Sequence, residues 1–413
     1  MLININMVKI KIWIKNLYQQ VVNSIAFYPA IITIAFLLIS FLSITLDFSE
    51  QGKQFKSQLY WLRLRDASTA RSIISSIVAG IITLTVFSFS MVMIVLNQTA
   101  SQMSNRILDK LIGSRFQQIV LGVYVGTIVY ALFLLSSIRD IDSGTRIPAL
   151  STYLLILITI LDVFLFIYFL HYITQSVKYN VIIRRIFKET KIPLENKCCL
   201  SEEPSVSLLI ENASVIYAEA SGIYESFEKH LLLHICNEND CTLQILPAPG
   251  TFILKGMPIV NSDKQLPPEV ISEINGSVNL HVTESIGENF FFGCRQLSEV
   301  AIKALSPGIN DPSTAIDSMR ALFQLYAHRV CHFPVNVIKN EKNKTRIIIN
   351  ELSFEVIFQR TLLPIWDYGK NDRMIQQEIR HLLTMLFSLN QNTSVGQLLQ
   401  EVELKILKKG EYE

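Results

Sequence analysis

The chain has 413 residues, of which 50% are hydrophobic and only 17% are charged, and its mean hydropathy is +0.35. This composition is too apolar for an average soluble protein of the same length. The formal net charge is only +2, and no long stripe of Lys and Arg interleaved with aromatic residues occurs. The charge pattern therefore argues against nucleic acid as a partner.

The apolar residues are concentrated in the first 180 positions, in four segments that are long enough to cross a bilayer core. Crossing takes about 20 helical residues, and the predicted spans are residues 25–46, 73–96, 119–138 and 149–172. The first span follows three lysines and so imitates a signal peptide. Its apolar stretch is too long for one, and no small-x-small cleavage site follows, so we expect it to remain as an anchor. The chain is expected to lie in a lipid bilayer.

The distribution of Lys and Arg predicts the orientation of these spans. Eleven of them lie in the N-terminal segment, the second loop and the segment after the fourth span, against seven in the first and third loops. By the positive-inside rule, both termini are expected in the cytoplasm. All six cysteines follow the last span without the paired spacing of a zinc site or a disulfide framework, and we interpret them as reduced thiols.

The second span carries a stripe of small and polar residues. Ser76, Thr83, Ser90 and Asn97, with Gly80 between the first two, recur at spacings that place them on one helix face. Such a face either permits close packing and hydrogen bonds between helices or lines a hydrated pathway. Both interpretations stay open at this point.

The third and fourth spans contain residues that are unusual in a bilayer. Gly122 and Gly126 form a GxxxG patch, which is typical of close helix contact. Asp162 lies near the middle of the fourth span, where a carboxylate costs at least about 2.5 to 3.5 kcal/mol unless it is neutral, solvated or paired. It is either a protonated group hydrogen-bonded to a Ser or Thr, such as those of the second-span stripe, or a proton or cation site. His171, near the end of that span, is either a titrating group or an interfacial side chain.

The rest of the chain is expected to form a cytoplasmic α+β region. We divide the chain into an N-terminal cytoplasmic segment (1–24), a four-helix transmembrane domain (25–180), a small β-rich subdomain (181–265) and a helical bundle (266–413). Strands are predicted at 207–210, 215–218 and 242–246, with a helix at 226–233. Helices are predicted at 290–305, 312–329, 354–366, 372–389 and 395–408.

The segment Ser306-Pro307-Gly308-Ile309-Asn310-Asp311-Pro312 separates two of these helices. Asp311 stands at an N-cap position and Pro312 at the first helical position that follows. We interpret the segment as a rigid corner, or alternatively as a ligand or subunit docking loop that uses Ser306, Asn310 and Asp311.

A metal site can also be drawn from His230, His234, Cys236 and Cys241, but their spacing matches no standard finger or ribbon. We therefore predict no metal and no cofactor.

The string Ala304 to Pro312, which contains SPGINDP, resembles the bacterial membrane proteins grouped as domain of unknown function 2254. The similarity extends over nearly the whole chain. It includes these segments: Ser88 to Met91, Ser101-Gln102, Gln118 to Gly122, Tyr168 to His171, and Gly250 to Pro258. The resemblance implies an uncharacterised protein of the inner membrane with no settled activity.

Three classes of function are compatible with these observations. A homo-oligomeric channel or channel-like transporter, gated by its cytoplasmic domain, is favoured by the second-span stripe, because four helices per chain need further copies to surround a wide pore. The alternative is a non-transporting scaffold or sensor whose cytoplasmic module binds a partner or small ligand. No GxSxG, P-loop or HExxH motif occurs, so we expect no catalytic residues and no enzyme. The permeant ion or ligand is not predicted.

Overall fold

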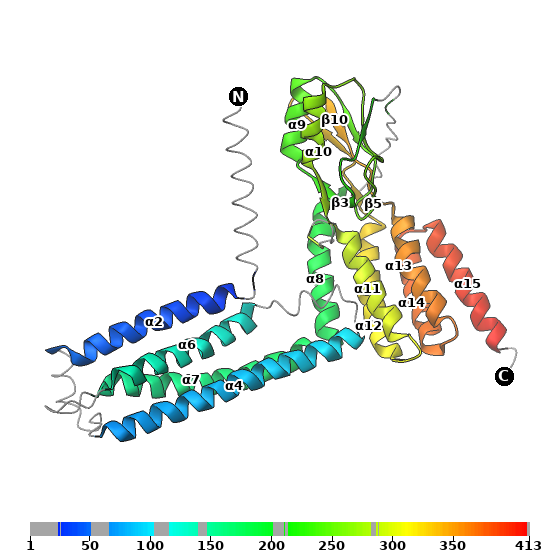
Figure 1. Cartoon of the computed structure of the whole chain (residues 1–413). Helices are drawn as coiled ribbons and strands as arrows, with labels where there is room; N and C mark the ends of the chain where they lie inside the picture. The colour runs from blue at the N-terminus through cyan, green and yellow to red at the C-terminus, as the bar shows by residue number, and fades with distance from the viewer. Residues whose placement is uncertain are drawn as a thin grey trace. The chain divides into compact units, whose positions relative to one another are not determined.

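The computed structural model describes residues 24, 26–50, 66–102, 115–138, 147–200, 210, 214–281, 286–287 and 289–410. The chain divides into two compact units, Met1–Lys178 and Tyr179–Glu413, whose elements are labelled in Figure 1. The predicted N-terminal segment up to residue 23, most of the loop residues that predicted the orientation, and residues 207–209 of one predicted strand lie outside the described residues.

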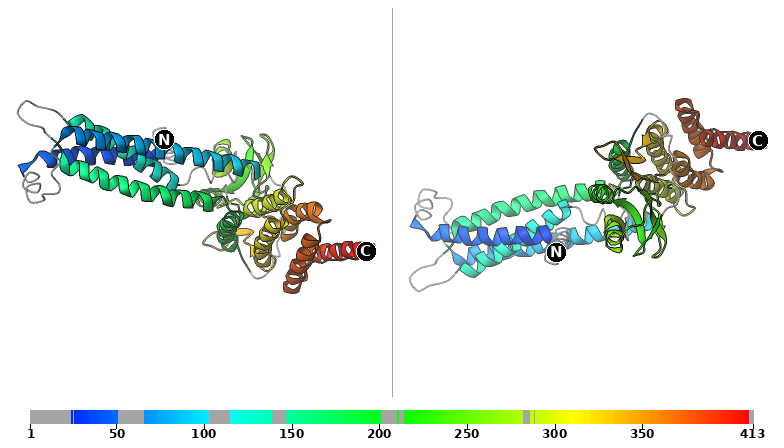
Figure 2. Two further views of the ribbon diagram at one scale, coloured as in Figure 1. Left: turned by 90° about the horizontal axis from the view of Figure 1, so that it is seen from below. Right: turned by 90° about the horizontal axis from the view of Figure 1, so that it is seen from above.

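The first unit consists of long apolar helices that run side by side (Figure 2). Four of its helices are long and apolar enough to cross a membrane, as the sequence predicts. They are α2 (Phe27–Phe48), α4 (Ala67–Gln102), α6 (Arg115–Ser137) and α7 (Ala149–Ser176). Helices α4 and α7 extend clearly beyond the predicted spans, because hydropathy detects only the apolar part of a helix. Helix α4 begins at Ala67, after Asp66, which accepts hydrogen bonds from the backbone N–H groups of Ser68 and Thr69 at 3.2 and 3.0 Å.

Helix α6 lies in the middle of this bundle and packs on α2, α4 and α7. Its Tyr124 and Tyr130 are fully buried. A Cβ at Gly122 would lie 2.9 Å from the backbone of Pro29, and one at Gly126 would lie 2.7 Å from the ring of Phe36. The GxxxG patch is therefore a packing device that lets α2 and α6 approach closely, as predicted.

The second unit combines helices with three small sheets (Figure 1). Its helices are α8 (Tyr179–Lys197), α9 (Lys229–Glu238), α10 (Pro268–Ser277), α11 (Phe290–Ala304), α12 (Pro312–Arg329), α13 (Phe354–Gly369), α14 (Arg373–Leu389) and α15 (Thr393–Gly410). Its strands are β1 (Cys198–Leu200), β2 (Ser214–Tyr217), β3 (Gly222–Phe227), β4 (Leu243–Ile245), β5 (Phe252–Ile253), β6 (Pro258–Ser262), β7 (Val278–His281), β8 (Phe333–Pro334), β9 (Val337–Lys339) and β10 (Thr345–Ile348).

The two larger sheets contain strands from both sides of residue 265, where we predict the boundary between a β-rich and a helical subdomain. The largest sheet has the order β2-β6-β4-β10-β9, in which β10 pairs in parallel with β4 and antiparallel with β9. A second sheet has the order β5-β3-β7. Strands that follow residue 266 thus complete both sheets, and residues 222–227, where the predicted helix begins, form β3 instead. Isolated short strands are not stable. The strands before residue 265 therefore bury their apolar face only when β7, β9 and β10 pair into the same sheets.

The helices of the second unit pack closely around α11 and α12. A Cβ at Gly293 of α11 would clash with Thr190 of α8, so only glycine permits this helix crossing. Ser298 of α11 donates to the carbonyl of Thr361 on α13 at 2.6 Å, and Ser318 of α12 donates to the carbonyl of Leu297 at 2.7 Å. Buried hydroxyls therefore tie α11 to both neighbours.

Candidate functional site in the helix bundle

The predicted polar stripe of α4 lies on the outer surface of the bundle. Ser76, Thr83, Ser90 and Asn97 are all exposed, and a Cβ at Gly80 would have no described atom within 4 Å. Thr83 donates to the carbonyl of Ala79 at 2.8 Å and Ser90 to that of Val86 at 2.9 Å. These hydroxyls are satisfied within their own helix, so the stripe does not mediate packing between helices of one chain.

Asp162 of α7, in contrast, is completely buried. Neither of its carboxyl oxygens has a hydrogen-bond partner among the described residues. Its polar neighbours are Thr127 and Tyr124, which lie on consecutive turns of α6. Thr127 donates to the carbonyl of Val123 at 3.0 Å. Of the hydroxyls that the sequence offers as partners for Asp162, those of the α4 stripe are exposed and bond within their own helix, and Thr127 of α6 lies beside the carboxyl instead.

The polar side chains beside Asp162 are themselves uncharged. A carboxylate at this depth without a cation costs several kcal/mol, and neither of its two polar neighbours, a hydroxyl and a phenol, supplies positive charge. A group of this kind either keeps a proton or binds a cation. The structure thus leaves Asp162 as a candidate intramembrane ionisable site, supported by side chains of its own chain.

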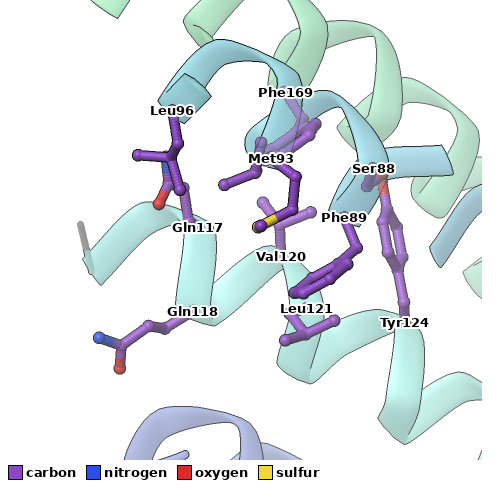
Figure 3. Close-up of a pocket in the computed structure, with 11 residues that line it drawn as sticks. Ser88, Phe89, Met93, Leu96, Gln117, Gln118, Val120, Leu121, Tyr124 and Phe169 are labelled. Carbon is purple, nitrogen blue, oxygen red and sulfur yellow. The ribbon is translucent and has the colours of Figure 1, made fainter. Parts of the chain in front are cut away.

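A cavity of about 240 Å³ lies between α4, α6 and α7 (Figure 3). Its walls are mostly apolar and include Phe89, Met93 and Phe169, while Ser88 and Tyr124 supply polar atoms. In Figure 3 the Tyr124 side chain extends from α6 toward Ser88 of α4. Tyr124 also interacts electrostatically with Asp162, so the residue that lines the cavity lies near the buried carboxyl as well. Ser88 and Tyr124 were not predicted as site residues, although polar side chains in the middle of apolar spans indicate buried polar contacts.

A second polar cluster at the other end of the bundle ties α2 to α7. Asp47, which is 1% exposed, accepts hydrogen bonds from the backbone N–H and the hydroxyl of Ser151, both at 2.7 Å, and from the N–H of Leu150 at 3.3 Å. The Tyr130 hydroxyl lies 2.9 Å from that of Ser43 and donates to the Ser151 carbonyl at 3.1 Å. Asp47 thus satisfies N–H groups in the first turn of α7, as a capping side chain does, although it lies 104 positions before Ser151 in the chain. This stabilising role was not predicted from the sequence.

The remaining predicted site residues do not join these clusters. His171 of α7 is exposed. In the second unit, Asp311 is the N-cap of α12, accepting from the N–H and the hydroxyl of Thr314 at 3.1 and 2.6 Å. Ser306 donates to the carbonyl of Lys303 at 2.7 Å, and Asn310 has a positive φ of 48°. The predicted capping geometry is confirmed, and the two interpretations of the segment, as a corner or as a docking loop, stay predictions.

The four residues from which a metal site can be drawn do not converge. Cys236 and Cys241 are buried in the core of the second unit, whereas His230 and His234 are exposed on α9. No group of three or more His, Cys, Asp or Glu side chains in the described ranges is placed to hold a metal ion. All six cysteines of the chain are free thiols, and burial raises the pKa of Cys198 to about 11 and that of Cys294 to about 12.

Four long apolar helices with buried polar groups between them define a multi-pass integral membrane protein. The chain belongs to the family described as predicted membrane protein (DUF2254), whose sequence pattern matches residues 22–385. Uncharacterized proteins of Mycobacterium bovis and Mycobacterium tuberculosis are each 21% identical over 344 residues. These matches cover 78% of this chain and 64% of each relative, so the chain spans less than two thirds of their length. No solved structure matches the chain.

Proposed function

We propose that copies of this chain assemble in the bacterial inner membrane as a homo-oligomeric channel or channel-like transporter. In this proposal the α4 stripes of neighbouring copies face one another and line the path, both termini lie in the cytoplasm, and the second unit acts as a gate. The observation that carries the proposal is the exposure of Ser76, Thr83, Ser90 and Asn97 on one outer face of α4.

Two physical arguments support this arrangement. The centre of the bundle is filled by α6, whose large side chains Tyr124 and Tyr130 are fully buried, so a wide path through one copy has no space. Small and polar residues give a lipid-facing helix no advantage, whereas they permit close approach and hydration where helices of several copies meet. The exposed Gly80 in the same face is explained in the same way.

Cysteine cross-linking in native membranes tests the assembly. Ser76→Cys and Ser90→Cys, each in a background without Cys199 and Cys331, are expected to form cross-linked dimers, because a disulfide needs Cα atoms within about 7 Å. Phe164→Cys, on an exposed apolar position of α7, is the matched control and is expected to stay uncross-linked. Equal cross-linking at all three positions, or none at any of them, would contradict the proposal.

Ion flux into liposomes that contain the purified chain tests the path. Ser90→Leu combined with Asn97→Leu is expected to abolish a flux that the unchanged chain supports. Ser75→Leu makes the same kind of change at an exposed position of α4 beside the stripe, and it is expected to leave the flux unchanged. Cross-linked oligomers without flux in any ion gradient would instead support the alternative, a non-transporting scaffold or sensor.

A further inference from the structure

A groove of about 520 Å³ lies in the second unit, between α9 and the turn that joins β9 to β10. It lies outside the transmembrane helices and takes no part in the proposed path. One wall carries His230 and His234, one turn apart on α9, and the other carries Lys339, Lys342 and Arg346. Its size falls within the range of about 300 to 1,000 Å³ that is usual for small-molecule sites.

Hydrogen bonds hold the two walls of this groove together. The side-chain amide of Asn340 donates to the side-chain oxygen of Asn237 on α9 at 2.9 Å. The Asn340 side-chain oxygen accepts from the backbone N–H groups of Lys342 and Lys344 at 3.1 and 3.0 Å, which fixes the turn. Lys339 is the last residue of β9 and Lys342 lies in the fixed turn. The backbone that carries both lysines is therefore ordered before a ligand binds, so binding costs little backbone entropy.

Positive charge in the groove exceeds the negative charge around it. Lys339, Lys342 and Arg346 line it together with a single carboxylate, Glu341. Glu238 on α9 is paired with His234 of the groove at 3.3 Å. A further acid near the groove, Asp240, is already shared by several cations. It contacts Lys344 and Arg346 at 2.8 Å and Lys264 at 3.5 Å, and this surplus of cations holds the pKa of Asp240 far below its usual value.

Arg346 forms the buried part of this charge. Its side chain is only 6% exposed, and its guanidinium donates to the Cys241 carbonyl at 3.2 Å and to Asp240 at 2.8 Å. Its Nε has no hydrogen-bond partner within the described part of the chain. A buried guanidinium that contacts a carboxylate shared with two lysines leaves net positive potential in the groove.

We propose that this groove binds a phosphate-bearing small anion of the size of a nucleotide or a sugar phosphate. Lys339 at the end of β9 and Lys342 in the fixed turn supply point charges for the phosphate oxygens, and the imidazole of His230 on the facing helix supplies a further donor. The apolar side of Leu233 on the same wall offers a surface for the uncharged part of such a ligand. The phosphate group comes either from a soluble metabolite or from a lipid headgroup.

Calorimetric titration of the full chain in a neutral detergent with pyrophosphate, at low ionic strength, tests the site. The unchanged chain is expected to bind pyrophosphate saturably, and Lys339→Glu with Lys342→Glu is expected to weaken binding by at least about tenfold, which corresponds to ~1.4 kcal/mol. Lys255→Glu reverses a charge on an exposed turn of the same unit outside the groove and is expected to leave the Kd within about twofold. Both replaced lysines of the groove are exposed, and Lys342→Ala repeats the measurement without charge reversal.

The same titration in nanodiscs separates the two sources of phosphate. If the natural occupant is a lipid headgroup, nanodiscs of phosphatidylglycerol will suppress pyrophosphate binding relative to nanodiscs of phosphatidylcholine; if it is soluble, binding will be equal in both. No saturable binding to the unchanged chain, or equal losses in the Lys255 and Lys339/Lys342 variants, would overturn the proposal. Neither result depends on whether the chain conducts ions.

Discussion

Replacement of Asp47 by Ala is expected to destabilise the helix bundle more than any other single change at its polar end. The carboxylate accepts two hydrogen bonds at 2.7 Å and one at 3.3 Å from residues 150 and 151, and its side chain is buried. A hydrogen bond to a charged group contributes about 1.5 to 3 kcal/mol, and the loss of its acceptor also leaves buried N–H groups without a partner. Because such losses are not additive, we expect a total of ~3 to 5 kcal/mol.

Two milder changes calibrate this prediction. Asp47→Asn keeps one acceptor oxygen for the N–H of Ser151 and is expected to cost about half as much as Asp47→Ala. Ser151→Ala removes only the hydroxyl contact, and we expect a loss of about 1 kcal/mol. In the double variant the Ser151 substitution should have almost no further effect, because its partner is already absent.

Thermal unfolding of the full chain in detergent, followed by circular dichroism of the helices, measures the effect. For a unit of about 150 to 250 residues, 1 kcal/mol corresponds to ~2 to 4 °C, so Asp47→Ala should lower the Tm of the bundle by at least about 6 °C. A Tm equal to that of the unchanged chain, or simple addition of the Asp47 and Ser151 effects, would show that the α7 N-terminus does not depend on this carboxylate.

Two further predictions concern glycines of the first unit and Glu351 of the second unit. Gly122→Ala is expected to destabilise the bundle by ~1 to 3 kcal/mol, since its Cβ would meet the Pro29 backbone at 2.9 Å, whereas Gly80→Ala should be neutral or slightly stabilising in a monomer; equal unfolding temperatures for both variants in detergent would contradict this. Burial raises the pKa of Glu351 above its usual value, so its protonated form is favoured in the folded state. The contribution of Glu351 to the free energy of unfolding is fully present below the pKa that this side chain has in the unfolded chain. It is lost as the pH rises through the higher pKa of the folded state. The Tm of the unchanged chain should therefore fall relative to that of Glu351→Gln as pH rises from 4 to 8, and parallel pH profiles would refute this.

Features that depend on local sequence were predictable. The four apolar helices follow from the length and hydropathy of each segment, since a bilayer requires the backbone of a spanning segment to hydrogen-bond within itself. The N-cap role of Asp311 follows from its place before Pro312, and a close helix contact at α6 follows from the Gly122 and Gly126 spacing, although the spacing does not name α2 as the partner. In each case the physical cause lies within a few residues of the pattern.

Features that depend on distant pairing were not predictable from one sequence. The contact between Asp47 and Ser151 joins residues 104 positions apart, and the pairing of β10 with β4 joins segments about 100 positions apart. Neither leaves a periodic signal in either partner. The groove of the second unit escaped for the same reason, because Lys339 and Lys342 become a site only when their turn meets α9.

Two sets of polar groups in the bundle bear on the path of an ion, and they lie in different places: Asp162 with its neighbours, and the α4 stripe. Asp162 is buried within its own chain and interacts with Tyr124, so any exchange of protons or cations there would take place in a single copy. The α4 stripe lies on the outside, so in the proposed assembly it lines a path between copies. Substitutions in the two sets therefore separate the two mechanisms: a flux that survives Ser90→Leu but is lost in Asp162→Asn would have to pass through one copy beside Tyr124, and the converse would place it between copies.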